Sequence, residues 1–166
     1  MRRPLVAALA GGAVLTIGSV ALAADSTYLA HLNGANEVPA RDTKAVGNTV
    51  FHLSEDGTEL SFKLIVANID NVVAAHIHLG PAGVNGPVVA FLASAAGGDT
   101  DNGELSAGTI TAANLVGPLT GQPLSALVNE INAGNTYVNV HTSDFDPTTP
   151  EGPGDFPAGE IRGQVG

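Results

Sequence analysis

The sequence contains no cysteine and no tryptophan, and aromatic residues make up only 4% of its 166 residues. Without cysteine the chain has no disulfide, no thiolate metal ligand and no lipoprotein attachment site. Basic residues are also scarce, with six lysines and arginines against sixteen aspartates and glutamates and a net charge of −10. Such a charge repels nucleic-acid phosphates and anionic lipid head groups, so we expect no nucleic-acid partner.

The first residues have the pattern of a secretory leader. Arg2 and Arg3 form a basic region, an uncharged apolar run extends from Leu5 to Leu22, and a small-x-small cleavage motif follows. We therefore expect residues 1–24 to be a signal peptide and residues 25–166 to be one exported domain, periplasmic or secreted, with no membrane contact after cleavage. A retained N-terminal anchor is the alternative, because the apolar run approaches bilayer-spanning length. Cleavage leaves four basic against sixteen acidic residues, a net charge of −12.

Alternating apolar and polar residues predict an antiparallel β fold. Segment 46–67 is typical of a hairpin whose arms join through Asp56-Gly57, a dipeptide that tolerates positive φ. In the first arm Phe51 faces the core and His52 faces solvent. Further strands are expected at Thr27–Asn33, Val72–Leu79, Val88–Ala93, Thr136–Thr142 and Glu160–Val165.

One segment has helical periodicity. Between Pro123 and Asn135, apolar residues recur at the i, i+3, i+4, i+7 spacing of a helix, at Leu124, Leu127, Val128 and Ile131. Gly134 follows where a helix commonly ends in a left-handed glycine. Seven or eight short strands and one connecting helix predict an all-β fold, an antiparallel sandwich of the immunoglobulin-like or Greek-key type.

Two acidic segments rich in glycine or proline interrupt this pattern, Gly97–Glu104 and Ser143–Pro157. The first begins like a calcium-binding loop with Asp99 and Asp101, but Ile110 stands where the loop requires its last glutamate. We expect both segments to be solvated loops.

Two of the five histidines lie one residue apart in the stretch AAHIHLGPAG. Because side chains alternate faces along a strand, His76 and His78 project together from one face while Ile77 points to the core. The stretch TYVNVHT repeats this logic and places Tyr137, Asn139 and His141 together on an outward face. If the two strands are neighbours, their outward rows lie about 5 Å apart and the three imidazoles converge.

Three imidazoles without a thiolate suit a late first-row metal ion, and copper is favoured over zinc because affinity rises toward copper. Asp144, three residues after His141, is a candidate to orient a ring or to supply an oxygen ligand. His31 and His52 are looser candidates, because nothing in the sequence brings them to the same ion. The alternative is that these histidines are ordinary polar residues on a half-exposed strand, since a H-x-H pair is a weak motif alone.

Four motifs in this order resemble the CHRD domain, the module named after repeats in chordin and also found singly in exported bacterial proteins. They are LNGANEVPA (32–40), AAHIHLGPAGVNGPVV (74–89), YVNVHT (137–142) and FPAGEIRGQV (156–165). The resemblance extends from about Thr27 to the C-terminus, and it implies an immunoglobulin-like sandwich outside the cytoplasm but little about activity.

A weaker similarity is to copper/zinc superoxide dismutase, which implies that His76, His78 and His141 correspond to copper ligands. The chain departs from that family because it lacks the cysteine pair and shows no zinc subloop. It also lacks an evident loop arginine to steer superoxide, because Arg162 lies in the last expected strand. We expect Arg162 to pair with a carboxylate rather than to act on a substrate.

The sequence has no G-x-S-x-G elbow, no cysteine nucleophile and no phosphate-binding glycine loop with a lysine. The first hypothesis is therefore a non-enzymatic exported protein that binds or stores a metal ion through His76, His78 and His141. The second is a copper redox enzyme of the dismutase type. The third is a metal-free module that recognises a periplasmic or extracellular protein or matrix through strand edges and acidic loops.

Overall fold

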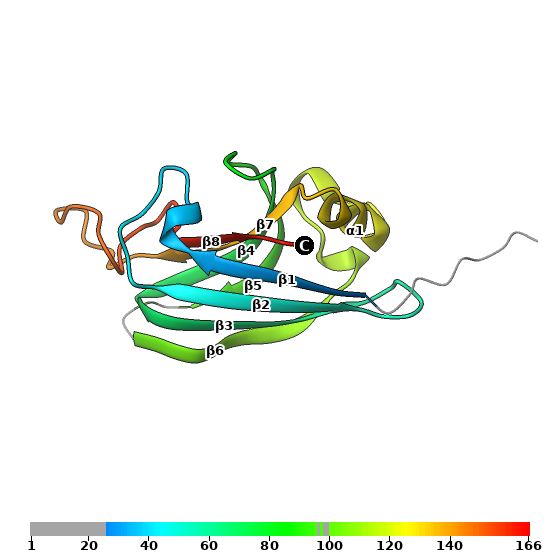
Figure 1. Ribbon diagram of the computed structural model, residues 1–166, viewed down its shortest axis with the longest axis horizontal. Helices are drawn as coiled ribbons and strands as arrows, with labels where there is room; N and C mark the ends of the chain where they lie inside the picture. The colour runs from blue at the N-terminus through cyan, green and yellow to red at the C-terminus, as the bar shows by residue number, and fades with distance from the viewer. Residues whose placement is uncertain (1–25, 96, 98–99) are drawn as a thin grey trace, which may run out of the picture.

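A computed structural model of the chain describes residues 26–95, 97 and 100–166, and the predicted signal peptide at residues 1–24 lies outside this part (Figure 1). Within the described part, no helix is long and apolar enough to cross a membrane. The strands are β1 Ser26–Asn33, β2 Val46–Leu53, β3 Leu60–Asp70, β4 Val72–Leu79, β5 Val88–Ser94, β6 Thr100–Ile110, β7 Thr136–Thr142 and β8 Ile161–Gln164.

These strands form one antiparallel sheet in the order β5-β4-β7-β8-β1-β2-β3-β6. The sheet curls over on itself, so that its two outermost strands, β5 and β6, come close together around a shared core. Figure 1 shows the helix α1, Leu124–Asn132, at one end of this sandwich and the 143–157 loop at the other. The predicted all-β antiparallel fold with one short helix is confirmed.

The predicted hairpin and helix form for the reasons that the sequence indicated. β2 pairs with β3 from Leu53 opposite Leu60, and Gly57 in the turn adopts a φ of 69°. Phe51 is buried in the core and His52 is exposed, as their alternation predicted. Along α1 the apolar face buries residues from each turn, and Gly134 ends the helix with a φ of 71°.

Strand β6 is not foreseen from the sequence. The expectation of a loop over Gly97–Glu104 is wrong from Thr100 onward, because the backbone there pairs with β3 up to Thr100 opposite Asp70. Two register shifts interrupt the pairing of β6 with β3, and these irregularities accommodate the turn-forming residues of the segment. Gly108 lets the Phe62 ring pack against the strand, since an added Cβ would lie 3.1 Å from Phe62 Cε1. The Ser143–Pro157 segment is a loop, as expected.

The outer face of β4, β7 and β8 is covered by three loop segments, 34–45, 80–87 and 143–160. Figure 1 shows the first two rising on the same side of the sheet. Tyr137 and Asn139 were expected to face solvent, but they are only 1% and 2% exposed. That expectation is wrong because alternation defines the two faces of a strand, whereas loops remote in sequence decide whether each face meets solvent. The covered face carries the histidines.

Candidate metal centre

The three histidines come together because β4 and β7 are neighbours in the sheet. His76 lies opposite Asn139, and His78 lies opposite Tyr137. The ring centroids are 4.9 Å apart for His76 and His141, 5.6 Å for His76 and His78, and 5.7 Å for His78 and His141. One nitrogen from each ring lies within 4.8 Å of the other two, a spacing from which these side chains could hold an ion.

Two of these nitrogens already have the separation of ligands on a shared ion. His76 Nδ1 lies 3.2 Å from His141 Nε2. With metal–nitrogen bonds of about 2.0–2.1 Å, two donors at that separation subtend an angle of about 100° at the ion. This angle is close to that of a tetrahedral site.

Backbone carbonyls fix the tautomers of two rings. His78 Nδ1 donates a hydrogen bond to the Gly86 carbonyl at 2.9 Å, and His141 Nδ1 donates one to the Pro157 carbonyl at 3.0 Å. Because a carbonyl only accepts, Nδ1 carries the proton in both neutral rings and Nε2 keeps its lone pair. His78 Nε2 is buried and has no hydrogen-bond partner among the described residues. The His78 lone pair is therefore free, whereas the His141 lone pair accepts a hydrogen bond from His76 Nδ1, which an ion bound between the two nitrogens would replace.

The surroundings also keep the rings uncharged. Burial, followed by repulsion from His141 and then from His78, lowers the pKa of His76 to about 4. Burial likewise lowers the pKa values of His78 and His141, although the hydrogen bonds to Gly86 and Pro157 oppose this. All three imidazoles are therefore neutral at pH 7, the protonation state that a metal ligand requires.

The rings are less exposed than a row on an open strand face. His78 is only 8% exposed, and the other two are half-buried. Phe91, opposite His76 on β5, packs edge-on against that ring at 5.0 Å and 84°. Tyr137 stacks on His78 with centroids 4.9 Å apart and an interplanar angle of 10°. The expectation of surface histidines is thus corrected to a partly enclosed cluster.

The looser candidates lie elsewhere. His31 and His52 are on β1 and β2, where they hydrogen-bond to Asn48 and Thr27 respectively. Asp144 does not orient His141: its carboxylate accepts hydrogen bonds from Asp146 N and Thr149 Oγ1 within its own loop. The Pro157 carbonyl performs the orienting role that the sequence analysis assigned to Asp144.

Two buried charged residues beside the cluster were not foreseen in these roles. The Arg162 guanidinium donates to the Pro81 and Val84 carbonyls and to Asn85 Oδ1, and it forms no ion pair with a carboxylate among the described residues. Glu37 is 6% exposed, and its Oε1 has no hydrogen-bond partner within the described part of the chain. Burial raises the pKa of Glu37 to about 7, although Arg162 and then Arg41 oppose this. The available sequence signal for the unusual role of Glu37 was its position as the lone acidic residue in the otherwise uncharged stretch LNGANEVPA.

Comparison with known proteins gives one significant match. The profile of the CHRD domain matches residues 28–148, well over half of the chain. The match includes all three histidines and ends before β8, which carries Arg162 and is hydrogen-bonded into the same sheet. No curated protein and no solved structure matches the chain significantly.

Proposed function

The chain belongs to the CHRD domain family, and we propose that it binds one transition-metal ion through His76, His78 and His141 in a non-enzymatic binding or storage role. The observation that carries this proposal is the convergence of three neutral imidazoles, two of them with Nε2 unprotonated because a backbone carbonyl accepts a hydrogen bond from Nδ1. Metal-binding histidines almost always make such a hydrogen bond with the ring nitrogen that does not bind the metal.

The energetics of His78 favour a ligand over a purely structural histidine. A buried nitrogen left without a partner costs roughly 1–3 kcal/mol, and His78 Nε2 is in that situation. Stacking on Tyr137 and the bond to Gly86 hold the ring in place, so little conformational entropy remains to be lost when an ion binds. An ion bound to His78 Nε2 removes the free-energy cost of keeping this buried nitrogen without a partner.

The donor set supports copper as the preferred ion. Imidazole suits copper, zinc and other late first-row ions, and affinity for a given site is highest for Cu(II). Calcium and magnesium prefer oxygen ligands, which this cluster of nitrogens does not offer. The leader-like N-terminal sequence supports binding in the periplasm or outside the cell.

A copper redox enzyme of the dismutase type is the second candidate. Three protein nitrogens leave coordination positions open, as a catalytic metal requires. The two functions differ in one measurement, because a dismutase consumes superoxide catalytically when loaded with copper and a storage protein does not.

The test is the metal content of the full chain expressed with its leader and purified without added metal. We expect one ion per chain in the wild type and in the His31→Ala and His52→Ala controls. We expect none in His141→Ala or in the double variant His76→Ala/His78→Ala. Absence of stoichiometric metal from the wild type contradicts the proposal and favours the metal-free recognition module. Loss of the metal only in the His31 or His52 variants contradicts the residue assignment.

A further inference from the structure

The buried Arg162 side chain holds the loop 80–87 that follows β4. Its Nη2 atom donates to the Pro81 carbonyl at 3.1 Å and to the Val84 carbonyl at 2.8 Å, and its Nη1 atom donates to Asn85 Oδ1 at 3.1 Å. Gln164, on the same strand, adds a hydrogen bond from Nε2 to the Gly80 carbonyl at 2.9 Å. β8 therefore fixes the loop near both of its ends.

This loop carries the oxygen that orients His78. The Gly86 carbonyl accepts the hydrogen bond from His78 Nδ1 at 2.9 Å. The Gly86 N–H donates to the Tyr137 hydroxyl at 3.0 Å. Gly86 leaves no space for a side chain, because an added Cβ would overlap the Leu79 carbonyl oxygen. The position of the Gly86 carbonyl thus depends on how the whole loop is held.

A second connection runs through stacked rings. The Arg162 guanidinium carbon lies 3.3 Å from the centroid of the Tyr137 ring. Tyr137 in turn stacks on His78, with centroids 4.9 Å apart. Arg162 consequently acts on both determinants of His78 geometry, the ring that packs against it and the loop that supplies its hydrogen-bond acceptor.

We propose that Arg162 is a positioning residue for the metal centre. By fixing the 80–87 loop it holds the Gly86 carbonyl against His78 Nδ1, which keeps the proton on that nitrogen and leaves Nε2 free for the ion. The inference rests on the proposed function for the ion itself. The tautomer it specifies, however, exists in the metal-free protein and is measurable without any metal.

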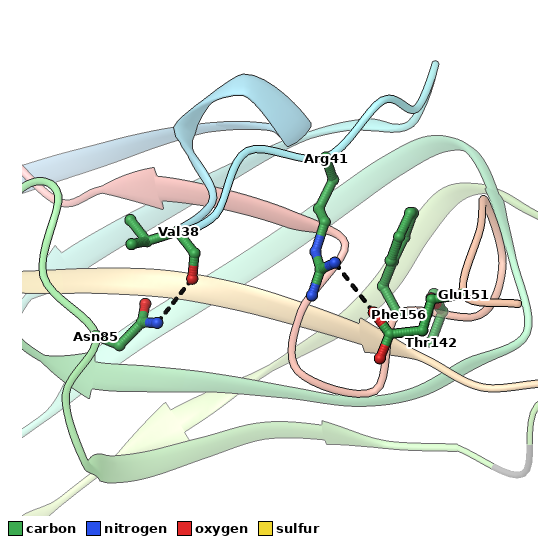
Figure 2. Close-up of polar contacts among 6 residues, drawn as sticks. All are labelled: Val38, Arg41, Asn85, Thr142, Glu151 and Phe156. Carbon is green, nitrogen blue, oxygen red and sulfur yellow. Dashed lines mark hydrogen bonds and ion pairs between the residues drawn. The ribbon is translucent and has the colours of Figure 1, made fainter.

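Electrostatic attraction to the ion does not explain why an arginine is buried at position 162, because a guanidinium beside a cation site repels the ion. The geometry of the guanidinium does explain the choice of arginine, because this planar group presents several hydrogen-bond donors in fixed directions and a lysine ammonium does not. Asn85 extends the same network: it accepts from Arg162 and donates from Nδ2 to the Val38 carbonyl at 2.7 Å (Figure 2). The loop is thereby tied to the segment that follows β1.

Arg41 provides a matched control because it holds the other loop. Its guanidinium pairs with Glu151 at 3.1 Å and lies 4.6 Å from the centroid of the Phe156 ring (Figure 2). That loop contains Pro157, which orients His141 and not His78. Replacing Arg41 therefore removes an arginine and a loop anchor without touching the acceptor of His78.

The experiment measures ¹⁵N chemical shifts of the histidine rings in the metal-free full chain, followed by titration with Cu(II). In the wild type and in Arg41→Gln, we expect His78 to be protonated at Nδ1. In Arg162→Gln and Arg162→Lys, we expect a mixture of the two neutral His78 tautomers and Cu(II) affinity lower by about tenfold or more. His141 should keep its Nδ1 proton in both Arg162 variants, which shows that the fold is intact.

Asn85→Ala provides a milder perturbation if the Arg162 variants fail to fold. It removes one acceptor of Arg162 and the tie to Val38, so we expect a smaller shift of the His78 tautomer in the same direction. An unchanged His78 tautomer in every folded variant overturns the positioning role. A shifted tautomer in a protein whose wild type binds no copper supports the positioning role and overturns the proposed function alone.

Discussion

Replacing Glu37 by glutamine tests whether the buried acid beside the metal centre carries a proton. Glu37 follows β1, is almost fully buried and forms no ion pair within the described part of the chain. Burial raises its pKa from the ordinary 4.5 to about 7, and the attraction of Arg162 and Arg41 compensates only in part. The Glu37 Oε1 atom and the Asn139 side-chain amide both border Gly159, because a Cβ added to that glycine would contact both of them.

The pKa gives the size of the effect. The folded protein binds more protons than the unfolded chain between pH 4.5 and about 7, so Glu37 makes stability fall as the pH rises through that window. One pKa unit corresponds to about 1.4 kcal/mol, so ionised Glu37 costs the fold about 3 kcal/mol above pH 7. Glutamine resembles the protonated acid in shape and hydrogen bonding and does not ionise.

We therefore expect Glu37→Gln to change stability little at pH 5 and to raise the free energy of unfolding by up to about 3 kcal/mol at pH 9. Urea unfolding of the metal-free protein at the two pH values measures this difference. Glu151→Gln, at an exposed carboxylate paired with Arg41, serves as a control and should show no such pH-dependent gain. A Glu37→Gln protein that is less stable than the wild type at pH 9 would refute the reasoning, because it would mean that Glu37 is stabilised as an anion.

Three further predictions concern the cluster and its surroundings. In the metal-free Glu37→Gln protein, which lacks the opposing titration of Glu37, stability should fall as the pH drops from 6.5 to about 4, because the unfolded chain takes up protons at histidines whose pKa the fold lowers, His76 above all; thermal unfolding across this range measures it. Phe91→Ala should raise the pKa of His76 toward 6.5 in an NMR titration, because the substitution exposes the ring that Phe91 covers. Gly86→Ala should lower the free energy of unfolding by more than about 2 kcal/mol in urea, because its Cβ overlaps Leu79, whereas Gly152→Ala, with space around it, should not.

Local pattern was sufficient to predict the strands that carry the candidate site. Alternation predicted β4 and β7 with the bounds that the structure has, and it placed His76, His78 and His141 on faces that turn out to be shared. Their convergence depended on β4 and β7 being neighbours, which is a property of the topology. Alternation along a strand does not determine which strands become neighbours, so the convergence itself became visible only in the fold.

The parts that were not predicted depend on contacts between distant segments. β6 contains Gly103 and Gly108 among polar residues and resembles a loop, but pairing with β3 and packing of Phe62 on Gly108 make it a strand. The burial of the outer face, the tautomer of His78 and the contacts of Arg162 all arise from loops that fold back over the sheet. Neither propensity nor periodicity contains that information.

The most direct test of the metal centre is the number of imidazole nitrogens bound to copper in protein loaded with one equivalent of Cu(II). Pulsed electron paramagnetic resonance counts these nitrogens in the wild type and in His76→Ala, His78→Ala and His141→Ala. The geometry predicts three in the wild type and two in each variant. Fewer than three in the wild type, or a count that none of the substitutions changes, would contradict the assignment of these histidines to one ion.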